Sequence, residues 1–130
     1  MARTVRTSWR RLKRTRPDVH EELAKSGRQN LTSSVTYRRM KKKRIRPVTK
    51  LATIREMARR ASTRSGVPIK ISKDMKRHKR ADGVTIRDGR NVEVHLHPVL
   101  KYYDKRYIRD VIGHELDHAK VMKRPLERRV

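Results

Sequence analysis

Apolar residues between positions 49 and 66 recur every three or four places, which is typical of a helix with one buried face. Thr49 is a suitable N-cap, and Gly66 followed by Pro68 is a typical helix end. We therefore predict a helix across this range. Its buried stripe would consist of Leu51, Ile54, Met57, Ala58 and Ala61.

Strand patterns follow this helix. Residues 67–72 alternate apolar and other side chains, which indicates a short strand. A polar, basic loop over residues 73–83 comes next. Residues 84–97 then alternate on both sides of Asp88-Gly89, a dipeptide that favours a two-residue hairpin turn. In the second strand of this hairpin, we expect Val92, Val94 and Leu96 to face the core, and Glu93, His95 and His97 to face solvent.

A last helix is predicted over residues 105–123, with Asp104 as its cap and Pro125 just beyond its end. Its apolar positions again have helical spacing. They are Ile108, Val111, Ile112, Ala119 and Met122. Residues 49–130 therefore form a small α+β domain in this prediction: a helix, three short strands including a hairpin, and a C-terminal helix.

Residues 1–48 have a much weaker pattern, and we interpret them as an extended, partly helical basic arm. The stretch SWRRLKRTRP could form one helical turn before Pro17, and residues 17–27 favour a short helix that ends at Gly27. Residues 28–37 show no periodicity, and residues 38–46 hold seven basic residues in nine. The predicted division is thus a basic arm over 1–48 and a folded domain over 49–130.

The charge of the chain supports this division. The formal net charge is +25, and residues 1–50 carry 17 Lys and Arg against 3 Asp and Glu, whereas residues 91–130 carry 9 against 6. Such a positive field attracts a polyanion, most plausibly nucleic acid, although a charge run can also be a solvated tail or a localisation signal. The expected contacts are Trp9, Arg10, Arg11, Lys13, Arg14, Arg16, Tyr37, Arg38, Arg39, Lys41, Lys42, Lys43, Arg44 and Arg46.

No segment resembles a helix-turn-helix, a zinc finger or a sequence-reading RNA module, so we expect contacts to the phosphate backbone without sequence preference. Both RNA and DNA stay open. The chain has no cysteine, which excludes a disulfide framework, and it has no apolar stretch typical of a membrane span or signal peptide. We therefore expect an intracellular protein (cytoplasm or nucleoid) or a virion protein, neither secreted nor bound to a membrane.

One motif in the last helix points to different chemistry. The stretch GHELDHAK, residues 113–120, contains His-Glu-x-x-His. His114 and His118 are four residues apart, so a helix presents both on one face, where two imidazoles can bind one zinc ion. Glu115 would lie beside the metal and could accept a proton from zinc-bound water. The alternative is that all three are polar positions of a charged helix.

Together with the preceding strand NVEVHLHP, this motif resembles the minimal core of zincin metallopeptidases. The order of elements is similar over about residues 50–123, and the resemblance is specific over about residues 92–120. It implies that His114 and His118 are zinc ligands and that Glu115 is the general base. Zincins supply a third ligand after the helix, for which Glu127 is the one acidic candidate downstream; His95 and His97 are possible substitutes.

Two main hypotheses follow. The first is a structural nucleic-acid-binding component of a nucleoprotein assembly, such as a ribosome-like particle or a viral nucleoprotein, built on a zincin-like fold and surrounded by other proteins. The second is an active zinc metallopeptidase that its basic arm brings to proteins bound to nucleic acid. A basic toxin or regulator from a mobile element is a third reading of the same composition.

Overall fold

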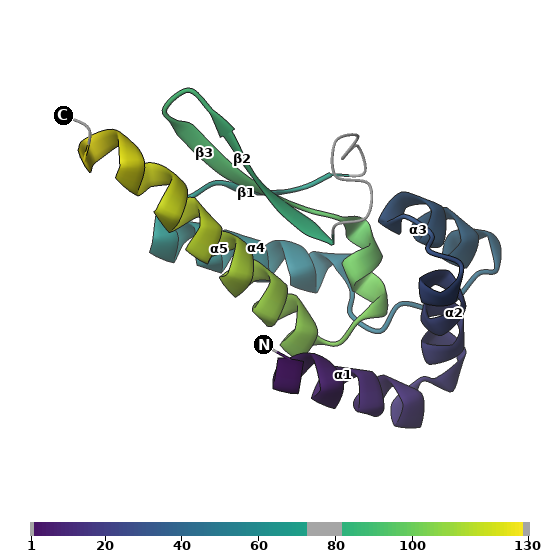
Figure 1. Cartoon of the computed structure of the whole chain (residues 1–130). Coiled ribbons are helices and arrows are strands. Elements are labelled where there is room, and N and C mark those ends of the chain that lie inside the picture. Colours follow the sequence, from purple (N-terminus) through teal and green to yellow (C-terminus); the bar gives the residue numbers. More distant parts are fainter. Residues whose placement is uncertain (1, 73–81, 129–130) are drawn as a thin grey trace.

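The computed structural model describes residues 2–72 and 82–128, with side chains over 8–72 and 82–123. Most of the predicted loop over 73–83 therefore lies outside the described residues. The α+β class is confirmed (Figure 1). The elements are α1 (Ala2–Thr15), α2 (Pro17–Arg28), α3 (Ser33–Lys42), α4 (Leu51–Ser65), β1 (Ile69–Ile71), β2 (Gly83–Asp88), β3 (Asn91–Leu96), the 3₁₀-helix η2 (Pro98–Tyr102) and α5 (Lys105–Arg128).

The three strands form one mixed sheet in the order β1-β3-β2, in which β1 is parallel and β2 antiparallel to β3. The hairpin is confirmed, but its turn is shifted by one residue from the prediction. Asp88 pairs with Asn91, so the two turn residues are Gly89 and Arg90. Gly89 has φ +62°, which suits the first position of a type II′ turn and leaves Asp88 in the strand.

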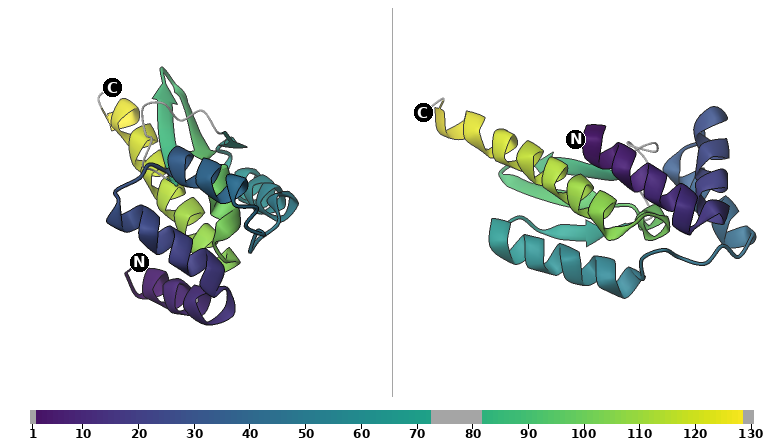
Figure 2. Two further views of the ribbon diagram at one scale, coloured as in Figure 1. Left: turned by 90° about the vertical axis from the view of Figure 1, so that its right-hand side faces the viewer. Right: turned by 90° about the horizontal axis from the view of Figure 1, so that it is seen from below.

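Helices α4 and α5 cover one face of the sheet, as the views in Figures 1 and 2 show. The alternation of β3 turns Val92, Val94 and Leu96 toward these helices, as predicted. The predicted stripes of α4 and α5 meet them there. The buried members of this first core cluster are Ile54, Ala58, Ala61, Val67, Val92, Val94, Leu96, Leu100, Ile108, Ile112 and Ala119.

The N-terminal residues are more ordered than the predicted arm. The stretch expected to be extended contains α3, which Thr32 caps by accepting a hydrogen bond from the Val35 amide at 3.2 Å. Helices α1, α2 and α3 pack against η2 around a second core cluster. Its buried residues are Leu12, Val19, Leu23, Tyr37, Met40, Val99 and Tyr102. The extended conformation was wrong because this cluster gives three short helices a common apolar partner.

The predicted division of the chain near residue 48 stays a prediction, but hydrogen bonds join the two sides of that position. The backbone amides of Val48 and Thr49 donate to the carbonyl of Lys101 at 2.8 and 3.0 Å. The Thr49 hydroxyl donates to the Tyr103 carbonyl at 2.7 Å, so Thr49 does not act as the side-chain cap of α4. The connection from α3 to α4 is thus attached to the segment just before α5.

The start of α5 agrees with the prediction from the sequence, and its end does not. Asp104 caps its start as expected, because Asp104 Oδ1 accepts a hydrogen bond from the Tyr107 amide at 3.0 Å. The helix continues to Arg128 instead of ending before Pro125. A proline inside a helix removes one backbone donor, and the neighbouring hydrogen bonds continue the helix in this case.

Candidate nucleic-acid interface and histidine pair

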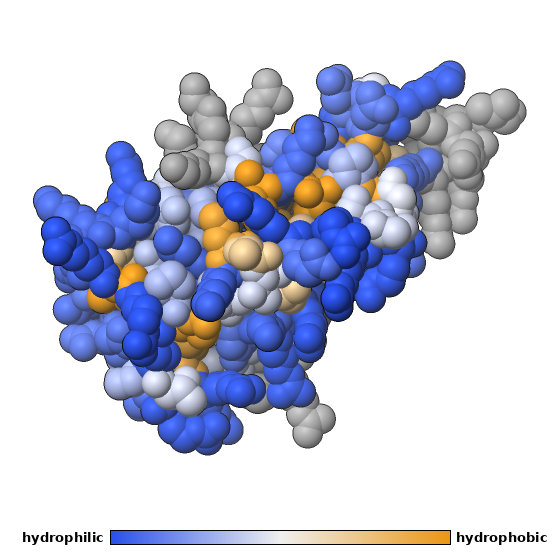
Figure 3. Space-filling view, turned by 180° about the vertical axis from the view of Figure 1, so that it is seen from behind, coloured by the Kyte–Doolittle hydropathy of each residue, from blue (hydrophilic) through white to orange (hydrophobic). Residues whose placement is uncertain are grey.

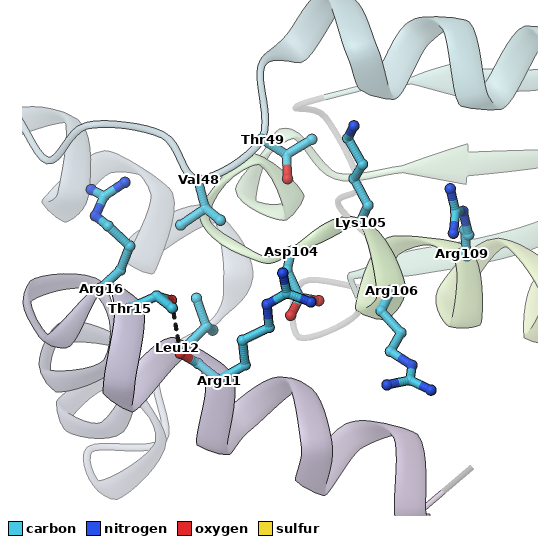
Figure 4. A pocket seen from close by; sticks show the side chains of 10 residues that line it. All are labelled: Arg11, Leu12, Thr15, Arg16, Val48, Thr49, Asp104, Lys105, Arg106 and Arg109. Atoms are coloured by element: carbon cyan, nitrogen blue, oxygen red, sulfur yellow. Dashed lines mark hydrogen bonds between the residues drawn. The ribbon is translucent and has the colours of Figure 1, made fainter.

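A basic groove lies between α1 and the first turns of α5 (Figure 4). Its cavity has a volume of about 800 Å³. Three separate parts of the sequence form its walls: the end of α1, the connection before α4 and the start of α5. The lining residues are Arg11, Leu12, Thr15, Arg16, Val48, Thr49, Asp104, Lys105, Arg106 and Arg109.

The charge of this groove is strongly unbalanced. Five of its ten lining residues are cationic and Asp104 is the one carboxylate. One oxygen of Asp104 caps α5, and the other is buried without a hydrogen-bond partner among the described residues. Cations that line one groove with so little compensation create a positive potential that attracts anions. The groove is therefore suited to phosphate.

Arg16 has a different role from the other cations of the groove. Its guanidinium donates to the backbone carbonyls of Arg46 and Pro47, at 2.5 and 3.1 Å, and pairs with Asp18 at 3.1 Å. It thus attaches the α1–α2 corner to the segment before α4. The side chains of Arg11, Lys105, Arg106 and Arg109 form no ion pair with another described residue. These four cations are available to a ligand.

Several of the nucleic-acid contacts predicted from the sequence lie on the surface. Trp9 is 37% exposed and packs against His20, with the ring centroids 4.2 Å apart. The exposed cations form two groups, one on α1 and one at the end of α3. They are Arg10, Arg11, Lys13 and Arg14, and Arg38, Lys41, Lys42, Lys43, Arg44 and Arg46.

Other predicted contacts, like Arg16, interact with residues of the fold itself. Tyr37 is only 8% exposed and packs edge-on against His97, so its ring is not offered to a nucleic-acid base. Arg39 donates to the Glu22 carbonyl at 2.8 Å and lies 3.4 Å from the Glu22 carboxylate. Lys43 also pairs with this carboxylate, at 2.8 Å, and its hydrogen bond is the main cause that lowers the pKa of Glu22.

Sequence reasoning missed Lys105, Arg106 and Arg109 as interface candidates. These cations belong to a helix with seven Lys and Arg against four Asp and Glu, a much smaller excess than the 17 against 3 of residues 1–50. Their significance arises from the packing of α1 beside the start of α5, which brings Arg11 to them. The clustering of basic residues at the beginning of that helix was the available signal.

The histidine pair lies further along α5. His114 and His118 are both exposed, and their Nε2 atoms are 3.0 Å apart, as helical spacing predicts. Two imidazoles this close can bind one metal ion together. Catalytic zinc needs three protein ligands, however, and the described part of the chain contains no group of three His, Cys, Asp or Glu that could hold a metal. The Glu127 side chain lies outside the described residues.

Glu115 points in another direction from the histidines. It is 8% exposed and contacts β2, where the Thr85 hydroxyl lies 2.9 Å from Glu115 Oε1 and 2.8 Å from the Glu115 carbonyl. The next residue on a helix is turned by about 100°, which places Glu115 toward the sheet while His114 faces solvent. In this arrangement the carboxylate attaches α5 to the hairpin.

His95 and His97, the possible substitutes for the third zinc ligand, both form contacts with other residues. His97 was expected to face solvent, but it is 1% exposed, because it follows the end of β3 and caps η2. Its Nδ1 accepts from the Val99 amide at 3.0 Å, its Nε2 lies 3.2 Å from the Ser34 hydroxyl, and burial lowers its pKa to about 4. His95 Nε2 lies 2.8 Å from Glu93 Oε1. Neither histidine joins the pair on α5.

Comparisons with known proteins do not indicate a function, so the fold and these contacts are the guide to it. No family model, curated protein or solved structure matches the chain. No helix in the described ranges is long and apolar enough to cross a membrane.

Proposed function

We propose that this protein is a structural nucleic-acid-binding component of a nucleoprotein assembly, and that it holds a phosphate backbone in the groove between α1 and α5. The observation that carries this proposal is that Arg11, Lys105, Arg106 and Arg109 line one groove, in which Asp104 is the one carboxylate. The exposed cations elsewhere on α1 and at the end of α3 would extend the path of the bound strand. A protein with this function would be found with nucleic acid in the cytoplasm, the nucleoid or a virion, beside other proteins of that assembly.

The expected binding is electrostatic and largely independent of base sequence. Each phosphate that meets an arginine or lysine releases condensed counterions, so affinity should fall steeply as salt rises. Trp9 is the one exposed aromatic residue among the described contacts that could stack on a base. A nucleic acid of either kind would therefore be bound mainly through its backbone.

A charge-reversal experiment tests the groove directly. Arg106→Glu/Arg109→Glu changes two groove cations, and Arg55→Glu/Arg64→Glu makes the same change of charge on α4, away from the groove. We expect the groove variant to lose at least about tenfold in affinity for mixed-sequence RNA or DNA, and its salt dependence to weaken by about two phosphate contacts. Equal losses in the two variants would mean that the total charge, and not the groove, binds the strand.

We keep a second candidate function because His114 Nε2 and His118 Nε2 lie 3.0 Å apart on an exposed face. In this alternative the protein has a zincin-like fold and is a zinc metallopeptidase, with Glu127 or a residue of another molecule as the third ligand. Glu115 would turn from its contact with Thr85 toward the histidines to act as the base. Elemental mass spectrometry should then find about one zinc per chain in the wild type and none in His118→Ala. Glu115→Ala should abolish cleavage of unfolded, nucleic-acid-bound proteins without weakening nucleic-acid binding.

A further inference from the structure

Among the strands of residues 2–72 and 82–128, β1 lies at an edge of the sheet and has β3 as its one neighbour. The Pro68 carbonyl accepts from the Val94 amide, and the Ser72 amide donates to the Leu96 carbonyl, both at 2.9 Å. Because the bonding residues of a parallel strand alternate, the backbone N–H and C=O groups of Ile69 and Ile71 point away from β3. No hydrogen bond joins these groups to another described residue. Such an edge can accept an added strand.

A groove runs beside this edge, between β1 and α4, with a volume of about 430 Å³. Ile69, Ile71 and Ala58 give it an apolar floor, whereas Arg55, Arg59 and two hydroxyl side chains of α4 form its rim. Figure 3 views the molecule from this side and shows hydrophobic surface framed by hydrophilic side chains. An added strand would direct every second side chain toward α4, into this groove.

The charge of the rim indicates which class of molecule the groove between β1 and α4 would bind. The rim has two arginines, Arg55 and Arg59, and no carboxylate among its lining residues. Arg59 pairs with Glu56, which lies outside the groove. Arg55 has no ion pair with any described side chain. A second copy of the chain would bring another charge of +25 to this rim, which disfavours self-association there. A nucleic acid would not use the apolar floor or the outward backbone groups, whereas an acidic peptide would use both.

We propose that the groove between β1 and α4 binds an extended segment of a partner protein, with alternating apolar and acidic residues, as a strand added to β1. The backbone of this segment would pair with Ile69 and Ile71. Its apolar side chains would cover the isoleucines, and its carboxylates would reach Arg55. This interaction uses a different surface from the groove between α1 and α5, so the protein could join a nucleic acid to a protein partner.

Fluorescence anisotropy with the 130-residue chain tests the chemistry of the partner. The probe is a labelled octapeptide of alternating valine and glutamate, and the controls are octapeptides of glutamate alone and of alternating valine and lysine. At about 150 mM salt, where charge attraction is screened beyond about 8 Å, we expect the valine–glutamate peptide to bind at least about tenfold more tightly than either control. Equal binding of the two acidic peptides would overturn the proposal, because charge alone would then explain it.

Two pairs of variants test the site. Ile71→Pro removes the outward backbone donor without breaking a bond to β3, while Ile71→Ala shortens the side chain and keeps the donor. We expect the proline variant to bind the peptide about fivefold more weakly than the alanine variant. Arg55→Glu should weaken binding, and Arg64→Glu, on the same helix but outside the groove, should not. Equal affinities within either pair would overturn the proposal.

Hydrogen exchange in the wild-type protein keeps the proposal testable if the proline variant fails to fold. The amides of Ile69 and Ile71 should exchange more slowly when the valine–glutamate peptide is added, because the peptide carbonyls accept hydrogen bonds from them. Unchanged exchange at both amides, at a peptide concentration that saturates the anisotropy signal, would contradict strand addition.

Discussion

The hydroxyl oxygen of Thr85 lies 2.9 Å from Glu115 Oε1 and 2.8 Å from the Glu115 carbonyl oxygen, at a buried contact between β2 and α5. One hydroxyl hydrogen therefore serves two acceptors of one residue. The acidic residue of the His-Glu-x-x-His motif is thus part of the contact between helix and sheet, whereas the two histidines of the motif face solvent.

Replacing Thr85 by valine should destabilise the fold. The change removes the donor and leaves buried oxygens of Glu115 without it, which should lower the free energy of unfolding by about 1–3 kcal/mol. Urea unfolding followed by circular dichroism measures this loss. Thr63→Val is a matched control, because the Thr63 hydroxyl donates to the Arg59 carbonyl at an exposed position, and it should cost less than about 0.5 kcal/mol. Equal losses would show that the burial of Glu115 is unimportant.

The titration of Asp82 should make the free energy of unfolding fall as pH rises. Its partly buried carboxylate accepts from the Tyr107 hydroxyl at 2.5 Å and the Ser33 hydroxyl at 3.3 Å, and desolvation raises its pKa above the ordinary 3.8. The folded state then binds a proton more readily than the unfolded state, so this contribution is present below pH 3.8 and is lost as pH rises through the folded pKa.

Asp82→Asn isolates that effect from the other carboxyls. The asparagine stays neutral, so the stability of the wild type relative to this variant should decrease with rising pH above 3.8. Urea unfolding of both proteins across this pH range measures the difference. A constant difference would show that Asp82 does not titrate abnormally.

His97 should act in the opposite direction at mildly acidic pH. Burial lowers its pKa from 6.5 to about 4, so the neutral imidazole is the form that the fold accommodates. Its contribution is complete above pH 6.5 and is lost as pH falls toward 4, which should cost about 1–3 kcal/mol. His97→Asn offers an acceptor to the Val99 amide but does not titrate, and its unfolding curve should lack this decrease. An identical decrease in both proteins would assign it to other groups.

Gly83 has little room for a side chain, whereas Gly113 has room for one. A Cβ atom at Gly83 would lie 3.0 Å from Val111 Cγ1 and 3.3 Å from Glu115 Cγ, so Gly83→Ala should push β2 away from α5 at a cost of about 1–3 kcal/mol. A Cβ atom at Gly113 would meet nothing within 4 Å, and Gly113→Ala should stabilise α5 by about 0.5–1 kcal/mol. Thermal unfolding of the two variants should therefore shift in opposite directions.

The parts of the fold that the sequence predicts are those with apolar periodicity. Helix α4, the short strand β1, the hairpin and α5 all bury, wholly or partly, the residues that their patterns indicate. Helix α3 escaped detection because its buried positions, Ser33, Thr36, Tyr37 and Met40, have helical spacing but include two hydroxyl residues that a hydrophobic pattern does not count. The charge of the chain indicates an anionic partner, but the groove depends on the packing of α1 beside α5, which no local pattern contains.

The second core cluster limits how the chain can be divided into fragments for experiments. Its members run from Leu12 to Tyr102, so the three N-terminal helices obtain their apolar partner only when η2 has been synthesised. A fragment that stops before Val99 would be a highly charged chain with too little apolar surface to fold, and one that begins at Thr49 would expose Val99 and Tyr102 to water. Neither fragment would therefore report how the same residues act in the intact chain. Point variants of the intact chain are therefore the right tools for assigning its surfaces.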